Sequence, residues 1–470
     1  MIARNRGFGL VEIMVGLMVG LISMVVVMQV YSVFENQKRA TTSGSDAQTN
    51  GALALYLMER EVRAAGNGMT EGEPLKFPPL AGCTTKVYDA TGAYLVPNKL
   101  SPFVSAVAEA GSVADIRLAP AIASDGGGGG ASDALTIAYG TSSITAPYTL
   151  SADYAAGSTP VGLYSMAGIS QNDMVALIQT NAGSGSNITP GTCSLLQATA
   201  APACPTCMGG AGTCPATGAG TCVSTCPVAG TCFCGGCNVP VTSGTRYNKG
   251  GGAVAGTFFS AVTTPGYAHL NNLGQLNVVT YRISGNNLVA DISRFGYDPV
   301  AAANVSNRTD FSPLASNIVN MQVQYGVDTG NPMGTIQANC KTNPVPGIPA
   351  MAATDADAVV DAWVDATGQW VNNGTTLPAL SDLRRIRAVR IGLVARSGVK
   401  EAGTACATTT TAPVIHWDSG PNMTPDLSAD ADWQCYRYKV FQTTIPVRNA
   451  LWSSTMSPAS SASCGARDLS

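Results

Sequence analysis

Charge is scarce in this 470-residue sequence: Lys, Arg, Asp and Glu make up 12% of it, and the formal net charge is −3. No run of Lys and Arg interleaved with aromatic residues is present, so we expect no basic surface for nucleic acid. Glycine, by contrast, is abundant at 52 residues. Low charge with much glycine indicates a loop-rich β protein and excludes a disordered acidic chain.

Histidine is also nearly absent, since His269 and His416 are the only two and stand in unrelated sequence contexts. The sequence therefore offers few candidates for the histidine of a catalytic triad. The sequence contains no P-loop, G-x-S-x-G or H-E-x-x-H pattern. We predict that the chain is not an enzyme and has neither a cofactor nor a bound metal. The one calcium alternative uses four acidic residues whose spacing also fits the solvated face of a helix: Asp355, Asp357, Asp361 and Asp365.

What the sequence does contain is an uncharged segment from residue 13 to residue 34, about the length that spans a membrane. Arg4 and Arg6 precede it, which places the N-terminus in the cytoplasm and the rest of the chain in the periplasm. A cleaved secretory signal needs a small-residue site after the apolar run, and residues 29–44 contain no convincing one. We therefore expect a single-pass inner-membrane protein, in contact with lipid, that keeps this helix.

The residues around the start of that segment are more specific. A short basic leader ends in Gly7, Phe8 follows, and Glu12 stands at the fifth position after the glycine. This pattern resembles the class III signal of type IV pilins and type II secretion pseudopilins, although Gly9 replaces the Thr or Ser of many pilins. The resemblance implies that residues 1–7 are a leader, that prepilin peptidase cuts between Gly7 and Phe8, and that the new N-terminus of Phe8 is methylated.

A carboxylate inside the apolar segment needs a physical reason, because it costs a few kcal/mol or more in lipid. By resemblance to pilins, Glu12 pairs with the N-terminal amine of Phe8 on a neighbouring subunit during assembly. The alternative is a glutamate that extends to the membrane interface. Gly16 and Gly20 form a G-x-x-x-G pair that allows close helix approach, although glycine is common in membrane helices anyway.

Helical character continues beyond the membrane, and we predict one helix over residues 13–65 within an N-terminal unit of residues 8–66. Leu55, Met58, Val62 and Ala65 recur at helical spacing and should pack on a globular head. Gly66 and Gly68 should end the helix. Ser43-Gly44 and Gly51 are positions where it is expected to bend or break.

The remaining residues, 67–470, show the patterns of strands. Segments rich in β-branched and aromatic residues predict an antiparallel sheet, and Ser284-Gly285-Asn286 predicts a tight turn. Residues 359–370 predict a short amphipathic helix with Val359, Val360, Trp363 and Val364 on one side. Residues 124–133 predict a flexible loop. The predicted strands are residues 133–140, 172–180, 277–284, 287–293, 317–329, 385–397 and 436–449.

Together these elements predict an α+β fold of type IV pilin-like architecture, with the long N-terminal helix packed on a C-terminal antiparallel sheet. The motifs EREVRAAGNG, MQVQYGVDT, RRIRAVRIGLVARS and YKVFQTTIPVRNALW occur in this order and resemble PilW-type minor pilins. The resemblance implies a structural component that helps initiate type IV pilus assembly, in contact with other minor and major pilins, prepilin peptidase and the inner-membrane assembly platform. It also implies an extracellular pilus location after assembly. The alternatives are a type II secretion pseudopilin and a pilus-tip adhesin.

Fourteen cysteines remain to be explained, nine of them in an insertion at residues 193–237. Export to an oxidising compartment favours disulfides for all of them. A zinc site from Cys204-x-x-Cys207 and Cys234-x-x-Cys237 and a redox dithiol are the alternatives. Nine is odd, so at least one partner lies outside the insertion. The candidates inside are Cys193, Cys204, Cys207, Cys214, Cys222, Cys226, Cys232, Cys234 and Cys237; those outside are Cys83, Cys340, Cys406, Cys435 and Cys464.

Overall fold

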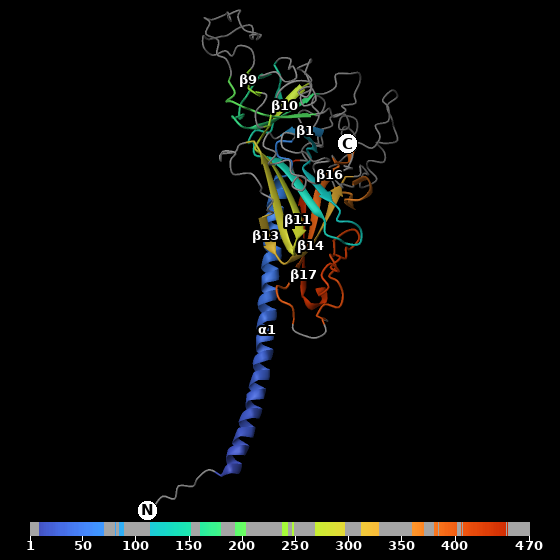
Figure 1. Ribbon diagram of the computed structural model, residues 1–470. Coiled ribbons are helices and arrows are strands. Elements are labelled where there is room, and N and C mark those ends of the chain that lie inside the picture. The colour runs from blue at the N-terminus through green and yellow to red at the C-terminus, as the bar shows by residue number, and fades with distance from the viewer. Residues whose placement is uncertain are drawn as a thin grey trace, which may run out of the picture.

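The computed structural model shows a long N-terminal helix that carries a β-rich head at its far end (Figure 1). All strand pairs in the described residues are antiparallel, so the predicted α+β class is confirmed. The structure describes residues 9–69, 80, 84–88, 113–151, 160–179, 193–203, 237–242, 247–248, 268–296, 312–328, 360–370, 380–383, 385–401, 406, 408–447 and 449.

Helix α1 runs unbroken from Leu10 to Ala64 over 55 residues, or roughly 80 Å at ~1.5 Å per residue. Its first part, Leu10–Glu35, is long and apolar enough to cross a membrane by length and composition, and residues 9–34 are all exposed. The expected breaks at Ser43-Gly44 and Gly51 do not occur. Packing explains this result at Gly51, whose Cα lies directly under the ring of Phe441.

The second half of α1 presents one continuous buried face to the head. The predicted contacts of Met58, Val62 and Ala65 are confirmed, since each is fully buried, and Leu55 is partly buried against the same core. Gly66 and Gly68 adopt φ values of +80° and +78° just after the helix, which ends it as predicted. The buried face continues towards the apolar span and consists of Ser43, Ala47, Gly51, Ala54, Met58 and Val62, with Ala65 directly after the helix.

A five-stranded sheet forms one layer of the head, in the order β13-β12-β11-β4-β3. Gly285 and Asn286 form the two-residue turn between β11 and β12 with φ of 56° and 63°, which confirms the predicted turn and is typical of a tight hairpin. The strands are β3 Ala121–Ser124, β4 Ala134–Gly140, β11 Leu276–Ser284, β12 Asn287–Phe295 and β13 Ser312–Ser316.

A four-stranded sheet, in the order β15-β14-β16-β17, forms the other layer, and α1 packs on β17, β16 and β13. Apolar side chains of both sheets and of α1 form one core cluster. We call these two sheets with the second half of α1 the proximal lobe. The strands are β14 Ile318–Val327, β15 Ala362–Asp365, β16 Ile386–Arg396 and β17 Tyr438–Pro446, with short helices η4 Gly368–Trp370, α4 Leu380–Leu383 and η5 Trp433–Cys435.

The predicted amphipathic helix over residues 359–370 is wrong. Residues 362–365 form the edge strand β15, paired with β14 from Gln324↔Asp365 to Val327↔Ala362, and η4 is the only helical turn described there. Trp363 packs against Gly326 of the neighbouring strand. Pairing with β14 thus outweighs a helical pattern that is too short to be decisive.

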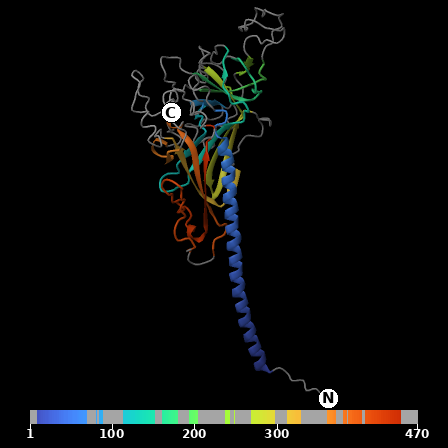
Figure 2. The same ribbon diagram turned by 180° about the vertical axis from the view of Figure 1, so that it is seen from behind.

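The remaining strands form a distal lobe, which we define as the described residues between 141 and 274. It contains the sheet β5-β10-β7-β8 and the small sheet β6-β9, with an apolar cluster of its own. Figures 1 and 2 show it at the end of the head farthest from the N-terminus of α1. Its strands are β5 Tyr148–Thr149, β6 Val161–Leu163, β7 Met174–Gln179, β8 Cys193–Gln197, β9 Cys237–Val239 and β10 Ala268–Gly274; β1 Thr84–Tyr88 and β2 Val113–Arg117 pair beside it.

The distal lobe enters and leaves the proximal lobe at one point. It follows β4 and precedes β11, and these two strands pair with Gly140 opposite Leu276. The distal lobe is therefore an insertion between two neighbouring strands of the five-stranded sheet. The predicted strands at 133–140, 172–180, 277–284, 287–293, 317–329, 385–397 and 436–449 correspond to β4, β7, β11, β12, β14, β16 and β17.

Candidate functional site

The first turn of α1 contains Glu12, exposed among apolar residues. Its backbone N–H donates to Gly9 O at 2.9 Å, which starts the helix. The carboxylate has no hydrogen-bond or ion-pair partner in the described residues, whereas Gly7 and Phe8 lie outside them. Gly16 and Gly20 have open space where a Cβ would stand, so the helix surface here is free to receive another helix.

Polar contacts attach the far end of α1 to the head. The hydroxyl of Tyr281 on β11 donates to Glu61 Oε2 at 2.6 Å. Asn449 Nδ2 donates to Ala65 O at 2.9 Å, which satisfies a carbonyl at the helix end, and Gly66 N donates to Ala138 O at 2.8 Å. Burial, with the nearby charge of Glu61, raises the pKa of Tyr281 well above its usual value, so the hydroxyl stays protonated as a donor.

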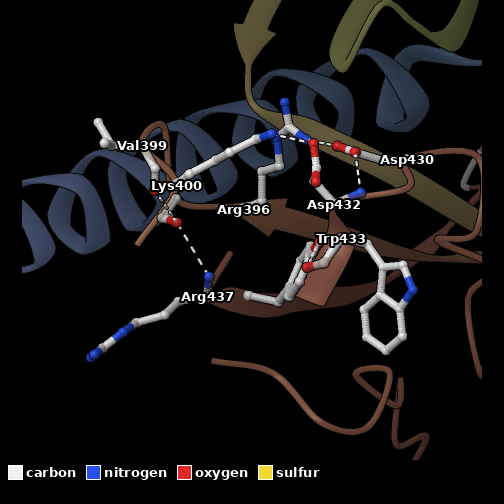
Figure 3. A network of polar contacts seen from close by, with 9 residues as sticks. Arg396, Val399, Lys400, Asp430, Asp432, Trp433 and Arg437 are labelled. Atoms are coloured by element: carbon white, nitrogen blue, oxygen red, sulfur yellow. Dashed lines mark hydrogen bonds and ion pairs between the residues drawn. The ribbon is translucent and has the colours of Figure 1, made fainter. Parts of the chain in front are cut away.

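Between β16 and β17 the chain makes a long excursion, residues 397–437, which lies beside α1 on the side towards the N-terminus (Figures 1 and 2). A disulfide between Cys406 and Cys435 closes it. Three ion pairs connect its ends, Arg396 with Asp430, Lys400 with Asp432, and Arg437 with Glu401. Figure 3 shows Arg396, Lys400, Asp430 and Asp432 around the start of η5.

Backbone contacts tie the excursion to the sheet and to α1. Ser397 N donates to Arg437 O at 2.8 Å, and the guanidinium of Arg396 lies 4.1 Å over the ring of Tyr436. Val399 N donates to Ser43 Oγ of α1 at 3.4 Å. Because Ser43 follows the apolar span by only eight residues, about 12 Å along a helix, the excursion lies near the end of the head that is closest to the apolar span.

The glycine-rich loop 124–133, predicted to be flexible, is bound at its ends, whereas Gly127, Gly128 and Gly129 at its tip are exposed with open space around them. A Cβ at Gly130 would lie 2.2 Å from Thr424 O, and Gly130 O accepts hydrogen bonds from Asn320 Nδ2 at 2.9 Å and Gln322 Nε2 at 3.2 Å. Glycine is used here for close backbone approach. Contacts with β14 and the excursion therefore hold the ends of the loop, which composition alone did not predict, and flexibility of the exposed tip stays a prediction.

Asp133 fixes the same loop from its other end. Its carboxylate accepts the N–H of Val323 at 2.7 Å and that of Gly126 at 3.1 Å, so it joins the loop to β14. Burial raises the pKa of Asp133 to about 7, while the two backbone donors oppose the rise. The chain therefore contains a buried carboxyl group that titrates near neutral pH.

Four of the fourteen candidate cysteines lie in the described residues, and all four are disulfide-bonded: Cys193, Cys237, Cys406 and Cys435. Cys406 and Cys435 lie with Asp432 at metal-ligand distances, but their bond to each other removes the thiolates. Because these two pair with each other, they are removed from the candidate outside partners of the insertion, which leaves Cys83, Cys340 and Cys464. Those outside the description are Cys83, Cys204, Cys207, Cys214, Cys222, Cys226, Cys232, Cys234, Cys340 and Cys464.

The other candidate residues are not brought together. His269 is buried on β10 of the distal lobe, where burial lowers its pKa to about 4, and His416 is exposed on the excursion. Asp361 and Asp365 lie at the edge strand β15, and Asp365 accepts a hydrogen bond from Gln324 Nε2 at 2.5 Å. Asp355 and Asp357 lie outside the described residues.

Sequence reasoning missed three groups: the Tyr281–Glu61 bond, the Asp133 carboxylate and Arg390, which is 2% exposed. A signal existed for Arg390, since β16 contains three arginines, Arg387, Arg390 and Arg396, among residues that are otherwise apolar. A cation in such a strand indicates a buried site with its own partners.

Comparison with known proteins gives one match. Residues 290–449 match the family model PilW, described as Type IV Pilus-assembly protein W. The matched region contains β13, β14, β15, β16 and β17 and excludes the distal lobe. Neither a curated protein nor a solved structure matches the chain. The match supports a type IV pilus-related family.

Proposed function

We propose that this protein is a minor pilin that helps to initiate assembly of a type IV pilus, and that its role is structural rather than enzymatic. One observation carries the proposal: the strands that match the PilW family, β16 and β17 above all, are those that pack on the helix beginning with the pilin-like signal. The description of the matched family favours the pilus over a type II secretion system.

In this proposal the chemical modification of the protein takes place at its N-terminus. Prepilin peptidase cleaves between Gly7 and Phe8 and methylates the new amine, and the subunit remains in the inner membrane with its head in the periplasm. The carboxylate of Glu12 has no partner in its own described chain, and in lipid it stays costly until it meets the amine of a neighbouring subunit. Formation of that ion pair favours the assembled state over the isolated subunit in the membrane.

The test is Glu12→Ala, with Asp46→Ala as a matched control. Both remove a carboxylate from an exposed position of α1, but Asp46 lies beyond the apolar span. We expect both variants to enter the inner membrane, and only Glu12→Ala to be absent from purified pili. Normal incorporation of Glu12→Ala as the sole copy would contradict the proposed pairing.

A second candidate, a pilus-tip adhesin that presents the cysteine-rich insertion, is favoured by the position of the distal lobe. Strands β8 and β9, which flank residues 204–236, lie at the end of the head farthest from the apolar span (Figure 1). The two strands that flank the insertion are therefore far from the apolar span and belong to the lobe outside the family match. Binding of host or surface ligands by whole pili with and without residues 204–236 tests this function.

A further inference from the structure

The guanidinium of Arg390 is buried on the outer face of the four-stranded sheet, between two indole rings. Its central carbon lies 4.6 Å from the ring centroid of Trp363 on β15 and 4.4 Å from that of Trp417 on the excursion. Two of its nitrogens have partners: Nε donates to Gln324 Oε1 and Nη1 donates to Ser419 O, both at 2.6 Å. Both acceptors are uncharged, so no carboxylate neutralises this cation directly.

We call Arg390, Trp363 and Trp417 the cage; two neighbouring donors in it have no acceptor among the described residues. Arg390 Nη2 is buried without a hydrogen-bond partner there, and so is Trp417 Nε1. The side chains are 2% and 9% exposed. Buried donors are almost always satisfied in folded proteins, and an unsatisfied donor costs about 1–3 kcal/mol, more when it is charged. The arrangement therefore lacks an acceptor.

The charge of the cage decides what kind of acceptor fits. Burial lowers the pKa of Arg390 to about 10, and the charges of Asp365 and Asp418 oppose the shift, so the group remains a cation at neutral pH. A buried cation is stabilised far more by an anion than by a neutral group. Guanidinium binds a planar carboxylate with particular geometric fit, and the indole N–H supplies a further donor.

We propose that Arg390 and Trp417 form a binding site for a carboxylate, supplied by a small organic acid or by an acidic side chain of a partner protein. The cover of the site is thin, because Asp418, Ser419 and Gly420 are exposed. A Cβ at Gly420 would lie 3.1 Å from Arg390 Nη2, so this turn lies directly over the free donor. Movement of the turn gives a carboxylate access without unfolding the sheet. The inference does not depend on the proposed function.

The test uses the full chain in detergent and two probes, acetate and a hexaglutamate peptide, each against chloride at constant ionic strength. Thermal unfolding should show a saturable rise in Tm with at least one probe. Acetate alone indicates a small organic acid, and tighter binding of hexaglutamate indicates a partner's acidic side chain. No saturable shift with either probe would overturn the proposal.

Matched variants assign the effect to the cage. Trp417→Phe keeps a stacking ring but removes the indole N–H, and we expect about tenfold weaker binding. Trp433→Phe, outside the cage, should bind as the wild type does. Arg390→Lys keeps the charge but not the fork of donors, and should abolish binding. Equal affinity in Trp417→Phe and wild type, or a crystal grown in acetate that holds only water at Nη2, would contradict the assignment.

Discussion

The proximal and distal lobes differ in how each is held together. The proximal lobe shares its core with α1, carries the ion-paired excursion and contains most of the family match. The distal lobe has an apolar cluster of its own, although one face of its larger sheet also contributes Met174, Ala176 and Leu195 to the proximal core. No strand of it packs on α1 to an extent comparable with β16 and β17. Between residues 141 and 275 the sequence has four charged residues, Asp153, Asp173, Arg246 and Lys249.

Under the proposed function, this difference assigns filament assembly to the proximal lobe and leaves the distal lobe for functions particular to this protein. A subunit that joins a filament through its N-terminal helix needs a head fixed rigidly to that helix, and the proximal lobe supplies the fixing contacts. The distal lobe leaves and returns at Gly140 and Leu276, and one face of its larger sheet packs into the proximal core through Met174, Ala176 and Ile178. Residues of the distal lobe outside that face can change without altering the contacts that hold α1. We therefore expect substitutions in the two lobes to have separable effects.

The largest expected effect comes from the shared core. Met58→Ala removes a fully buried side chain of α1 and should lower the free energy of unfolding by about 2–5 kcal/mol. Hydrogen exchange of the full chain should show faster exchange in β16 and β17. Leu196→Ala, fully buried in the distal cluster, is the matched control and should accelerate exchange in β7 and β10. The same pattern from both variants would show that the lobes unfold together.

Loss of the disulfide should affect the excursion selectively. The bond between Cys406 and Cys435 closes a loop with a sequence separation of 29, which in the chain-entropy model stabilises the fold by about 3–4 kcal/mol. A Cys406→Ala/Cys435→Ala variant should therefore lose stability and become protease-sensitive within residues 397–437. Limited proteolysis with mass mapping measures this. Cleavage that begins in the distal lobe instead would contradict the expected separation.

Asp133 should give the proximal lobe a pH dependence. Its pKa is raised to about 7 in the folded state and is ordinary when unfolded, so the folded state binds the extra proton. Stability is greatest below about pH 4 as far as this group is concerned, and it falls as pH rises towards 7, by at most about 4 kcal/mol. Denaturant unfolding between pH 4 and pH 8 should show this slope.

Asp133→Asn should abolish that slope. Asp173→Asn is the distal comparison, because burial also raises the pKa of Asp173 but the carboxyl group is more exposed. We expect it to change the slope less. A wild-type slope of opposite sign would mean that the two backbone donors outweigh burial at Asp133.

The smallest effect should come from single hydroxyl groups. Tyr281→Phe removes the hydrogen bond to Glu61 and should lower stability by about 1–2 kcal/mol, with faster exchange at the end of α1. Tyr148→Phe in the distal lobe removes a bond to the backbone oxygen of Ala167 and should cost about 1 kcal/mol, without an effect on α1. Thermal unfolding and hydrogen exchange compare the two.

Sequence patterns predicted the elements whose burial is regular. The α1 face from Met58 to Ala65 repeats at helical spacing, and β14 and β16 are long strands in which apolar residues, many of them β-branched, are the majority. Both patterns reflect contact with one continuous core, so local sequence is sufficient to reveal them. The Gly285-Asn286 turn was equally predictable, because few residues adopt positive φ twice in succession.

Other features depend on partners distant in sequence. Residues 362–365 become a strand because they pair with the edge of β14. The ends of the loop 124–133 are held because Gly130 packs against Thr424 and Asp133 accepts a backbone hydrogen bond from β14. The same holds for the cage around Arg390, which joins β14, β15, β16 and the excursion. The residue pattern of β16 alone cannot reveal these contacts, because the other three segments provide them.

The folding of a head without the apolar span depends on how much of α1 it keeps. A chain that begins near Gly66 lacks Ala54, Met58 and Val62, which are fully buried in the proximal core. We therefore expect a head that begins at Gln37, after the apolar span, to be better folded than one that begins at Gly66.

The most direct test of the central claim is the mature N-terminus of the protein isolated from membranes. Mass spectrometry should find a chain that begins with N-methylated Phe8. Loss of residues 1–7 removes Arg4 and Arg6, so the formal charge should change from −3 to −5. A chain that retains Met1, or one that begins after residue 30, would contradict the minor pilin account.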